Sequence, residues 1–331
     1  MADYLYGAAN VRALEHAMIG RERLSRLMEA KTLDEAYAML SEYGVRLLRD
    51  AESGVVLRED TLLGILRDAY KRLGELAPDS EALRLWRYPY DCNNVKAVIK
   101  CRARGIDPLP MTFDFGTVEA LELVQNADLE QIEALPAAMR TACGEAVAAF
   151  AKTKNPQVVD LILDRACYAD MLRAAKAAES EMVLSLVTAQ IDLTNVMMLL
   201  RVLRMQSGEA CKALLASALL EGGSLSKSFF EDVVELGEDA LWTGLRQTAY
   251  AAYADAFLIS NRTLTAAERL ADDYRMNILR ARRFDMGALE TMVAFLLGHE
   301  YAVRNLRILL SGKEAGLDTA TIRERIRESY V

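Results

Sequence analysis

The chain has 331 residues, of which 52% are hydrophobic and 27% charged, and it carries a formal net charge of −8. A chain of this length can bury roughly three quarters of its surface in one compact body, although two or three domains also fit the length. The acidic balance argues against a nucleic-acid backbone as the main partner, because such binding depends on clustered lysine and arginine. Abundant helix formers, only 6 prolines and few alternating apolar and polar runs predict an all-α protein.

The first hundred residues read as a series of helices. We expect helices over residues 4–19, 21–29 and 33–41, and a longer one from about 61 to a break at 77–79. Thr32, followed three residues later by Glu35, is typical of a capping box. Pro89 is expected to stop the next segment, and Asp91 to cap a helix that ends at Gly105.

The rest of the chain continues in the same way after a linker. Two prolines in Ile106–Pro110 make that segment the best linker candidate. Asp192 is expected to repeat the capping role, in a helix that runs out near Gly208. Ala302 stands where the third helix would carry such an aspartate, so that helix is expected to continue from the preceding one. Further helices are expected over residues 158–176, 211–220, 240–259, 266–283, 285–297 and 318–328, the last capped by Asp318.

One pattern occurs three times along the chain. Asn94, Asn195 and Asn305 recur at intervals of 101 and 110 residues, and each is followed by apolar residues one, four and five positions later. That spacing marks one face of an α-helix. The pattern predicts three diverged helical units, over residues 1–107, 108–209 and 210–331, related by roughly three-fold pseudo-symmetry.

The three asparagines have two interpretations. An asparagine in the first turn of a helix can satisfy a backbone group or a neighbouring polar group, which is a structural role. Alternatively, three equivalent helices could line a shared surface that contacts a partner. The candidate partner-interface residues on these helices are Asn94, Lys96, Asn195, Arg201, Asn305 and Arg307.

Signatures of catalysis are mostly absent from the sequence. His16 and His299 are far apart, and neither has metal-ligand spacing with a cysteine or a second histidine. Ser311-Gly-Lys313 resembles the end of a phosphate loop, but Arg307 stands where such a loop needs glycine. Carboxylates are plentiful, and their spacing singles out no acid–base pair. We therefore predict no catalytic residue, no cofactor and no metal site.

Cysteine usage and hydropathy indicate the compartment. The 5 cysteines form no C-x-x-C pair, which suggests reduced thiols in a cytoplasmic setting. The N-terminus lacks a basic stretch followed by an apolar core, so no signal peptide is predicted. The longest uncharged run, Met182 to Ile191, is about half of a membrane span, so we expect the chain not to cross a membrane.

Several of these segments together resemble a known family. They are YGAANVRALE (Tyr6 to Glu15), the three asparagine-anchored helices, LLEGGSL (Leu219 to Leu225) and the block from Glu300 to Gly316. They resemble the C subunit of prokaryotic A/V-type rotary ATPases, whose eukaryotic counterpart is the d subunit. The resemblance covers essentially the whole chain, and the C-terminal block is its most specific part.

The resemblance implies a fold and a role. The family implies a funnel of three pseudo-equivalent helical units without catalytic activity, a monomer within its complex. A protein of this kind sits on the cytoplasmic side of the cell membrane, contacts the proteolipid ring and the central-stalk subunits, and passes on rotation during proton or sodium transport or ATP synthesis. It binds no nucleic acid and meets the membrane only through the ring. The anchor helices differ in their caps and basic residues, so no residue-level interface is carried over.

Two other classes of function remain open from the sequence. An α-helical repeat scaffold for soluble protein partners should have a continuous concave groove along stacked repeats. A helical enzyme that uses dispersed carboxylates should have a closed pocket in which their pKa values are perturbed.

Overall fold

The computed structural model describes residues 4–78, 80–205, 209–284 and 286–331, with backbone alone at 209–211. Within these ranges every regular element is a helix, and the one β-type pairing is a single bridge between Arg49 and Val56. The predicted all-α class is therefore confirmed. The expected helix ends at Gly208 and Asp285 and the side chain of Cys211 lie outside the described residues.

Packing divides the chain into two compact bodies. The first, which we call the terminal body, combines Met1–Asp79 with Ala256–Val331, and the second, the middle body, is Ser80–Asp255. The three-unit division at residues 107 and 209 follows sequence similarity rather than packing, and it stays a prediction.

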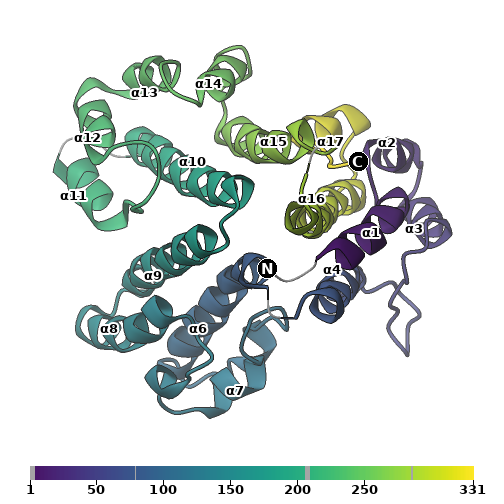
Figure 1. Ribbon diagram of the computed structural model, residues 1–331, viewed down its shortest axis with the longest axis horizontal. Helices are drawn as coiled ribbons and strands as arrows, with labels where there is room; N and C mark the ends of the chain where they lie inside the picture. Colours follow the sequence, from purple (N-terminus) through teal and green to yellow (C-terminus); the bar gives the residue numbers. More distant parts are fainter. Residues whose placement is uncertain (1–3, 79, 206–208, 285) are drawn as a thin grey trace. The chain divides into compact units, whose positions relative to one another are not determined.

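The terminal body is built around one long helix. Its helices are α1 (Leu5–Leu14), η1 (Glu15–Ala17), α2 (Arg21–Glu29), α3 (Leu33–Glu42), α4 (Arg58–Leu76), α15 (Leu264–Ala281), α16 (Ala288–Glu314) and α17 (Thr319–Arg325). Helix α16 packs against α1, α2, α3, α4 and α17, so helices from both ends of the chain share its apolar surface (Figure 1). Its 27 residues run through the third anchor without a break, which confirms the expected continuity at Ala302.

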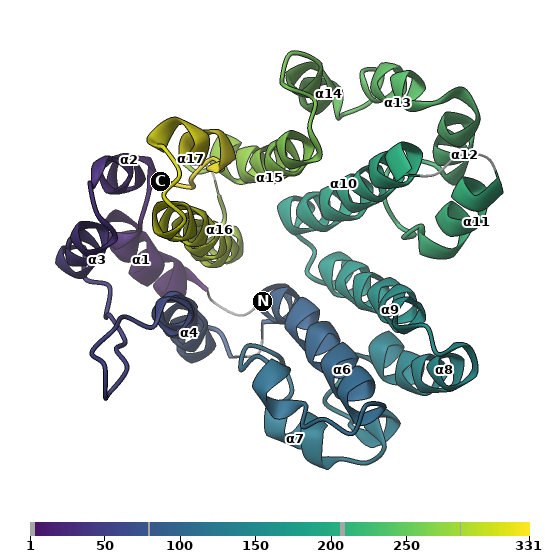
Figure 2. The same ribbon diagram turned by 180° about the vertical axis from the view of Figure 1, so that it is seen from behind.

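The middle body is a set of packed helices around α9. Its elements are α5 (Glu81–Arg84), η2 (Leu85–Arg87), α6 (Tyr88–Arg102), η3 (Leu109–Met111), α7 (Ala120–Gln125), η4 (Leu129–Gln131), α8 (Ala137–Thr153), α9 (Pro156–Ala177), α10 (Glu181–Met205), α11 (Glu209–Ala218), α12 (Lys227–Leu236) and α13 (Glu238–Leu245). A further helix, α14 (Ala251–Leu258), spans the boundary between the bodies. Helix α9 lies between α8 and α10 and also packs against α6 (Figure 2).

Helix α10 is the one described helix that is long and apolar enough to cross a membrane. However, 67% of its most apolar window is buried inside the protein. It packs against α9, α11 and α12, which use its apolar faces. A helix that is apolar all round lies either in the core of a large protein or in a membrane. Because α10 is buried inside this protein, its hydropathy is that of a core helix.

Several expected helix boundaries are confirmed. Thr32 caps α3 by accepting a hydrogen bond from the Glu35 backbone N–H, and Asp318 caps α17 through Thr321. Helix α4 ends just before the break expected at Ala77. The continuous helix expected over 240–259 is wrong, since α13 and α14 are separate. Thr248 donates from Oγ1 to the Leu245 carbonyl, a local side-chain bond that competes with helix continuation.

The expected caps at Asp91 and Asp192 are also wrong. Helix α6 begins at Tyr88, and Pro89 lies in its first turn rather than stopping a segment. That position suits proline, whose missing N–H would have no partner there anyway. Helix α10 begins at Glu181, so Asp192 lies well inside it. Both carboxylates are fully buried and bind elsewhere.

The four cysteines with described side chains are free of disulfides. Cys92, Cys143 and Cys167 are buried in the middle body, and Cys101 is half-buried. Burial raises the pKa of the Cys143 thiol to about 12, so at neutral pH that residue is an apolar packing group.

Candidate functional site

The first two anchor asparagines make the same pair of hydrogen bonds. Asn94 donates from Nδ2 to the carbonyl of Phe113 at 2.8 Å, and the Phe113 N–H donates back to Asn94 Oδ1 at 2.8 Å. Asn195 does the same with Leu220, at 2.8 and 2.9 Å. We call each arrangement an asparagine clamp.

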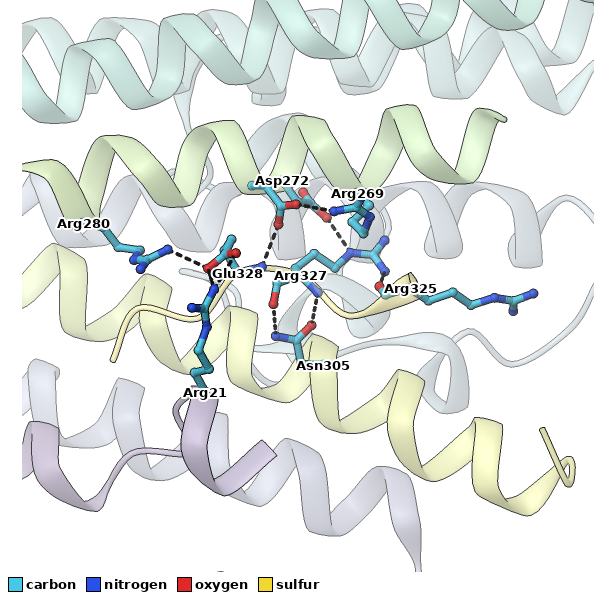
Figure 3. A network of polar contacts seen from close by, with 9 residues as sticks. Arg21, Arg269, Asp272, Arg280, Asn305, Arg325, Arg327 and Glu328 are labelled. Atoms are coloured by element: carbon cyan, nitrogen blue, oxygen red, sulfur yellow. Dashed lines mark hydrogen bonds and ion pairs between the residues drawn. The ribbon is translucent and has the colours of Figure 1, made fainter. Parts of the chain in front are cut away.

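The third anchor forms a clamp of identical design. Asn305 donates from Nδ2 to the Arg327 carbonyl at 3.0 Å and accepts from the Arg327 N–H at 2.9 Å (Figure 3). In all three cases a side-chain amide pairs with the backbone of a residue 19 to 25 positions further along the chain. The clamp therefore fixes a later, irregular segment of the chain onto its anchor helix. We call these segments, which contain Phe113, Leu220 and Arg327, the returning segments.

Burial makes these bonds important for stability. Asn94, Asn195 and Asn305 are 0%, 2% and 0% exposed. A backbone N–H and C=O in an irregular segment cannot be left unpaired away from water, and the amide supplies one acceptor and one donor. The structural interpretation of the asparagines thus has a direct geometric basis. Any effect of these amides on a partner would pass through the segments that they hold.

A buried aspartate strengthens the first clamp. Asp91 lies three residues before Asn94 and accepts from Thr117 N at 3.0 Å, from Thr117 Oγ1 at 2.7 Å and from Val118 N at 3.2 Å. Burial raises the pKa of Asp91 even though these bonds and the Arg87 guanidinium act to lower it. The carboxylate is therefore held in place at a cost in desolvation.

Asp192 repeats this arrangement at the second clamp. It accepts from Ser224 N at 2.8 Å, from Ser224 Oγ at 2.6 Å and from Leu225 N at 3.1 Å. The Tyr250 hydroxyl donates a further bond at 2.6 Å. In both clamps the hydroxyl residue lies four positions after the backbone that the asparagine holds. The repeat thus extends to a second set of equivalent contacts that the sequence pattern does not reveal.

A glycine precedes each hydroxyl residue for a steric reason. A Cβ atom at Gly116 would lie 2.2 Å from Asp91 Oδ1, and one at Gly223 would lie 2.0 Å from Asp192 Oδ1. Real Cβ atoms do not approach oxygen this closely, so any side chain must displace the carboxylate from its donors. The buried Asp192 therefore requires glycine at position 223 of the GGS motif in residues 222–224.

We expect Gly223→Ala to lower the free energy of unfolding by about 2 kcal/mol, because overpacking and weakened bonds to Asp192 act together. Urea denaturation followed by circular dichroism measures the change. The matched control is Gly74→Ala in α4, where a Cβ would meet nothing within 4 Å. There the better helix propensity of alanine should give a gain of up to about 1 kcal/mol. Equal effects of the two substitutions would contradict the steric explanation.

The third clamp obtains its carboxylates from another helix. Ala302 replaces the aspartate, and Asp273 of α15 accepts from the Glu328 N–H at 2.7 Å. Its neighbour Asp272 accepts from Arg327 Nε at 3.1 Å (Figure 3). At this anchor, the segment that Asn305 of α16 holds is therefore also held by carboxylates of α15, whereas at the first two anchors the carboxylate comes from the anchor helix itself.

Asp272 is the centre of a buried ionic cluster. It pairs with Arg275, with Arg304 at 2.6 Å and with Arg327 at 3.1 Å. Burial by itself would raise the pKa of Asp272, but the three guanidinium groups outweigh it and hold the pKa below the ordinary value. Little in the sequence indicates this cluster, since arginines alternating with acids near the C-terminus are typical of a solvated helix face. The acidic pair at 272–273 within an otherwise amphipathic helix is the available signal.

The last residues of the chain join several helices of the terminal body. Glu328 pairs with Arg21 of α2 at 2.8 Å and with Arg280 of α15 at 2.6 Å (Figure 3). The Tyr330 hydroxyl donates to Glu15 at 3.1 Å, and the Arg21 N–H donates to the Val331 carbonyl at 2.9 Å. The C-terminal segment is therefore a structural element of this body.

The three basic candidates differ in accessibility. Lys96 is an internal residue of the middle body, because its side chain is 14% exposed and its Nζ pairs with Asp164 at 2.5 Å. Arg201 is exposed on α10. Arg307 is 42% exposed in its side chain and pairs with exposed Glu59 at 2.9 Å. Arg201 and Arg307 are thus the candidates that a partner can reach.

Residues with possible chemical roles are used in packing. Burial lowers the pKa of His299 to about 4, so this histidine is neutral at physiological pH. Ser311–Lys313 belongs to the last turns of α16, and Lys313 donates to the carbonyls of Met28 at 3.0 Å and Ala30 at 2.5 Å. No group of three or more His, Cys, Asp or Glu side chains suited to a metal ion occurs among the described residues.

Comparison with known proteins identifies the family. Residues 8–325 match the family described as ATP synthase (C/AC39) subunit. The chain belongs to this family. The match includes all six candidate interface residues of the anchor helices. As a C/AC39 protein, the chain is the C subunit of an A/V-type rotary ATPase, a membrane-associated complex.

Relatives of this C/AC39 protein align over most of their length. The C subunit of the A-type ATP synthase of Methanocaldococcus jannaschii is 22% identical over 98% of this chain and 86% of its own. The C subunit of the V-type sodium ATPase of Enterococcus hirae is 26% identical over 79% of each chain. The C subunit of the A-type ATP synthase of Thermococcus kodakarensis is 23% identical over 98% of this chain and 90% of its own.

Proposed function

We propose that this C/AC39 protein is a non-catalytic socket of the central stalk, which couples the rotating stalk to the proteolipid ring during ATP-driven ion transport or ATP synthesis. The single observation that carries the proposal is the repetition of the asparagine clamp at all three anchors. Together with family membership, it gives the chain three similarly braced helices, each fixed to a returning segment.

A coupling element needs stiffness rather than chemistry. Irregular segments are normally the most mobile parts of a fold, because they have few buried contacts. Here the returning segments are held by buried amides, and two of them also by buried carboxylates from the same anchor helix. Because low dielectric strengthens such bonds, torque applied to a segment would be passed to its anchor helix instead of being lost in loop motion.

The proposed position follows from the same role. We place the protein on the cytoplasmic side of the cell membrane, with its contact to the membrane made through the proteolipid ring and its other contacts made to central-stalk subunits. The predicted funnel of three pseudo-equivalent units would surround the stalk. Burial of most of α10 supports a peripheral rather than an integral position.

The accessible cations of the anchor helices provide a test. We expect Arg201→Glu combined with Arg307→Glu to reduce co-purification of the proteolipid about tenfold at physiological salt, because reversed charges at an interface repel the partner. The protein is purified by a tag from its native membranes in mild detergent, and its partners are quantified by mass spectrometry. The double variant should keep its helicity, since the Arg307 pair with Glu59 is exposed and contributes little.

Two controls separate assembly from folding. Arg165→Glu changes an exposed arginine on α9 that lies outside the anchor helices, and it should leave co-purification unchanged. Lys96→Glu disrupts a partly buried ion pair and should lower thermal stability. Unchanged recovery of the ring with the Arg201 and Arg307 double variant would move the socket away from these residues.

A further inference from the structure

The terminal body contains a groove of about 700 Å³ that the clamps do not use. It lies between α4, α16 and the segment that follows α3. Residues from all three form its lining, among them Tyr43, Arg46, Gly64, Ile65, Arg72 and Phe295. Its size is within the range of sites that bind ligands or peptide side chains.

The floor of the groove is apolar and uncharged. Met18 and Phe295 are buried there, and the Phe295 and His299 rings meet edge to face at 4.6 Å between centroids. Ile65 of α4 is half-buried at its side. Such a floor can accept an aliphatic or aromatic side chain and exclude water around it.

The rim of the groove is basic. Arg46, Lys71 and Arg72 line it, and none of them makes an ion pair with any residue that the structure describes. Arg67 lines it too, as do the carboxylates of Asp68 and Glu75. The rim therefore has an excess of two positive charges in a chain whose net charge is −8. Unpaired cations around an apolar floor complement a partner that is acidic around an apolar anchor.

Gly64 adds an independent observation. It lies inside α4, where glycine costs up to about 1 kcal/mol relative to alanine. A Cβ atom at this position would meet nothing within 4 Å, so the fold itself does not require glycine here. The missing side chain leaves the groove open at a point where another chain can approach closely.

We propose that this groove receives an acidic peptide segment of a stalk subunit, with an apolar side chain seated over Gly64. The inference rests on the proposed function, since it assumes that the neighbours are subunits of the rotary complex. A peptide fits better than a lipid surface, because an anionic bilayer favours a cluster of lysine and arginine alone. The carboxylates of Asp68 and Glu75 suit a partner that also carries some positive charge.

Photo-crosslinking within the assembled complex tests the proposal. p-Benzoylphenylalanine is introduced in place of Gly64, and in a second variant in place of Gly74, which lies on the same helix outside the groove. After irradiation of the complex purified from native membranes, the crosslinked peptides are identified by mass spectrometry. We expect the probe at position 64 to capture a net-acidic segment of a stalk subunit, and the probe at position 74 to capture none.

A second measurement uses natural side chains. Gly64→Leu places a side chain where the partner's apolar residue is proposed to sit, and Gly74→Leu makes the same change in helix propensity outside the groove. We expect Gly64→Leu to reduce the recovery of the captured stalk protein about fivefold or more, and Gly74→Leu to leave it unchanged. Arg46→Glu combined with Arg72→Glu should give a similar loss that shrinks as salt is raised, because salt screens the lost attraction.

The outcomes distinguish the two proposals. If the wild-type protein brings no stalk or ring subunits with it, the proposed function fails, and the groove inference fails with it. If the complex is intact but position 64 captures a lipid, a basic segment or only its own chain, the groove inference alone is overturned. The same conclusion follows if Gly64→Leu and Gly74→Leu give equal recovery.

Discussion

Replacing Asn195 with alanine is expected to lower the free energy of unfolding by about 3 kcal/mol. The change removes both bonds of the second clamp. It leaves the N–H and the C=O of Leu220 without partners in a position where the residue is buried. Each unsatisfied buried group costs about 1 to 3 kcal/mol, because water that would replace the lost partner has little access to it. Urea denaturation of the purified protein measures the loss.

Asn155→Ala is the matched control for this prediction. Asn155 caps α9 through one hydrogen bond to the Gln157 N–H at 3.0 Å, at an exposed position. The loss of such a cap costs about 1 kcal/mol. Asn94→Ala and Asn305→Ala should cost more than Asn155→Ala but less than Asn195→Ala, because Phe113 is exposed and Arg327 half-buried, so water can reach the freed backbone groups. If the four variants were equally stable, the clamps would contribute no more than an ordinary helix cap.

Asp272→Asn should destabilise the terminal body by about 3 to 5 kcal/mol at neutral pH, because the removal of one member of a buried ionic cluster leaves its partners uncompensated. Three arginines, at positions 275, 304 and 327, would then face one another around a neutral amide. Arg304 is partly exposed, and water reduces the cost at that member. The free energy of unfolding, measured in urea at pH 7, provides the test.

The pH dependence of this effect has a definite sign. The folded-state pKa of Asp272 is below the ordinary value of 3.8, so the ionised carboxylate stabilises the fold above pH 3.8. That contribution is lost as pH falls through the folded-state pKa. The difference between the wild type and Asp272→Asn should therefore be largest at neutral pH and shrink below pH 4.

Asp91 provides the opposite case. Its pKa is raised by burial, so the folded state gains a proton more readily than the unfolded state. Its ionisation costs stability as pH rises from 3.8 through the raised value. The advantage of the wild type over Asp91→Asn should therefore decrease with rising pH in that range. Parallel pH profiles for the two variants would contradict the assignment of opposite shifts.

The sequence predicted the existence of the anchors better than their role. The periodic apolar positions after Asn94, Asn195 and Asn305 are a local signal, and such a signal predicts a helix from the sequence alone. The partners of the asparagines lie 19 to 25 residues away in irregular segments, and no periodicity marks them. Which backbone an amide will hold is decided by tertiary packing, which a single sequence does not encode in a readable pattern.

The errors at the aspartates have a related cause. Asp91 and Asp192 precede apolar runs, as N-caps do, so the capping interpretation follows from local rules. Helix α6 begins earlier than expected because its first turn accepts Pro89. Helix α10 begins at Glu181 and continues without interruption through Asp192. At the third anchor the carboxylate comes from α15, far upstream in the sequence. Local charge alternation places Arg327 on a solvated face, although its side chain is buried in the cluster around Asp272.

The place of the third clamp in the chain has a consequence for biosynthesis. The middle body is contiguous, so it can close its two clamps while the ribosome is still adding residues. The terminal body needs Glu328, on the segment that the third clamp holds, to meet Arg21 of α2, which is synthesised 307 residues earlier. At roughly 5 to 20 residues per second, α2 waits roughly 15 to 60 seconds for that partner. Helices α1 to α4 are thus synthesised before the middle body and completed after it, and their exposed apolar faces are the surface that a nascent-chain chaperone would need to cover.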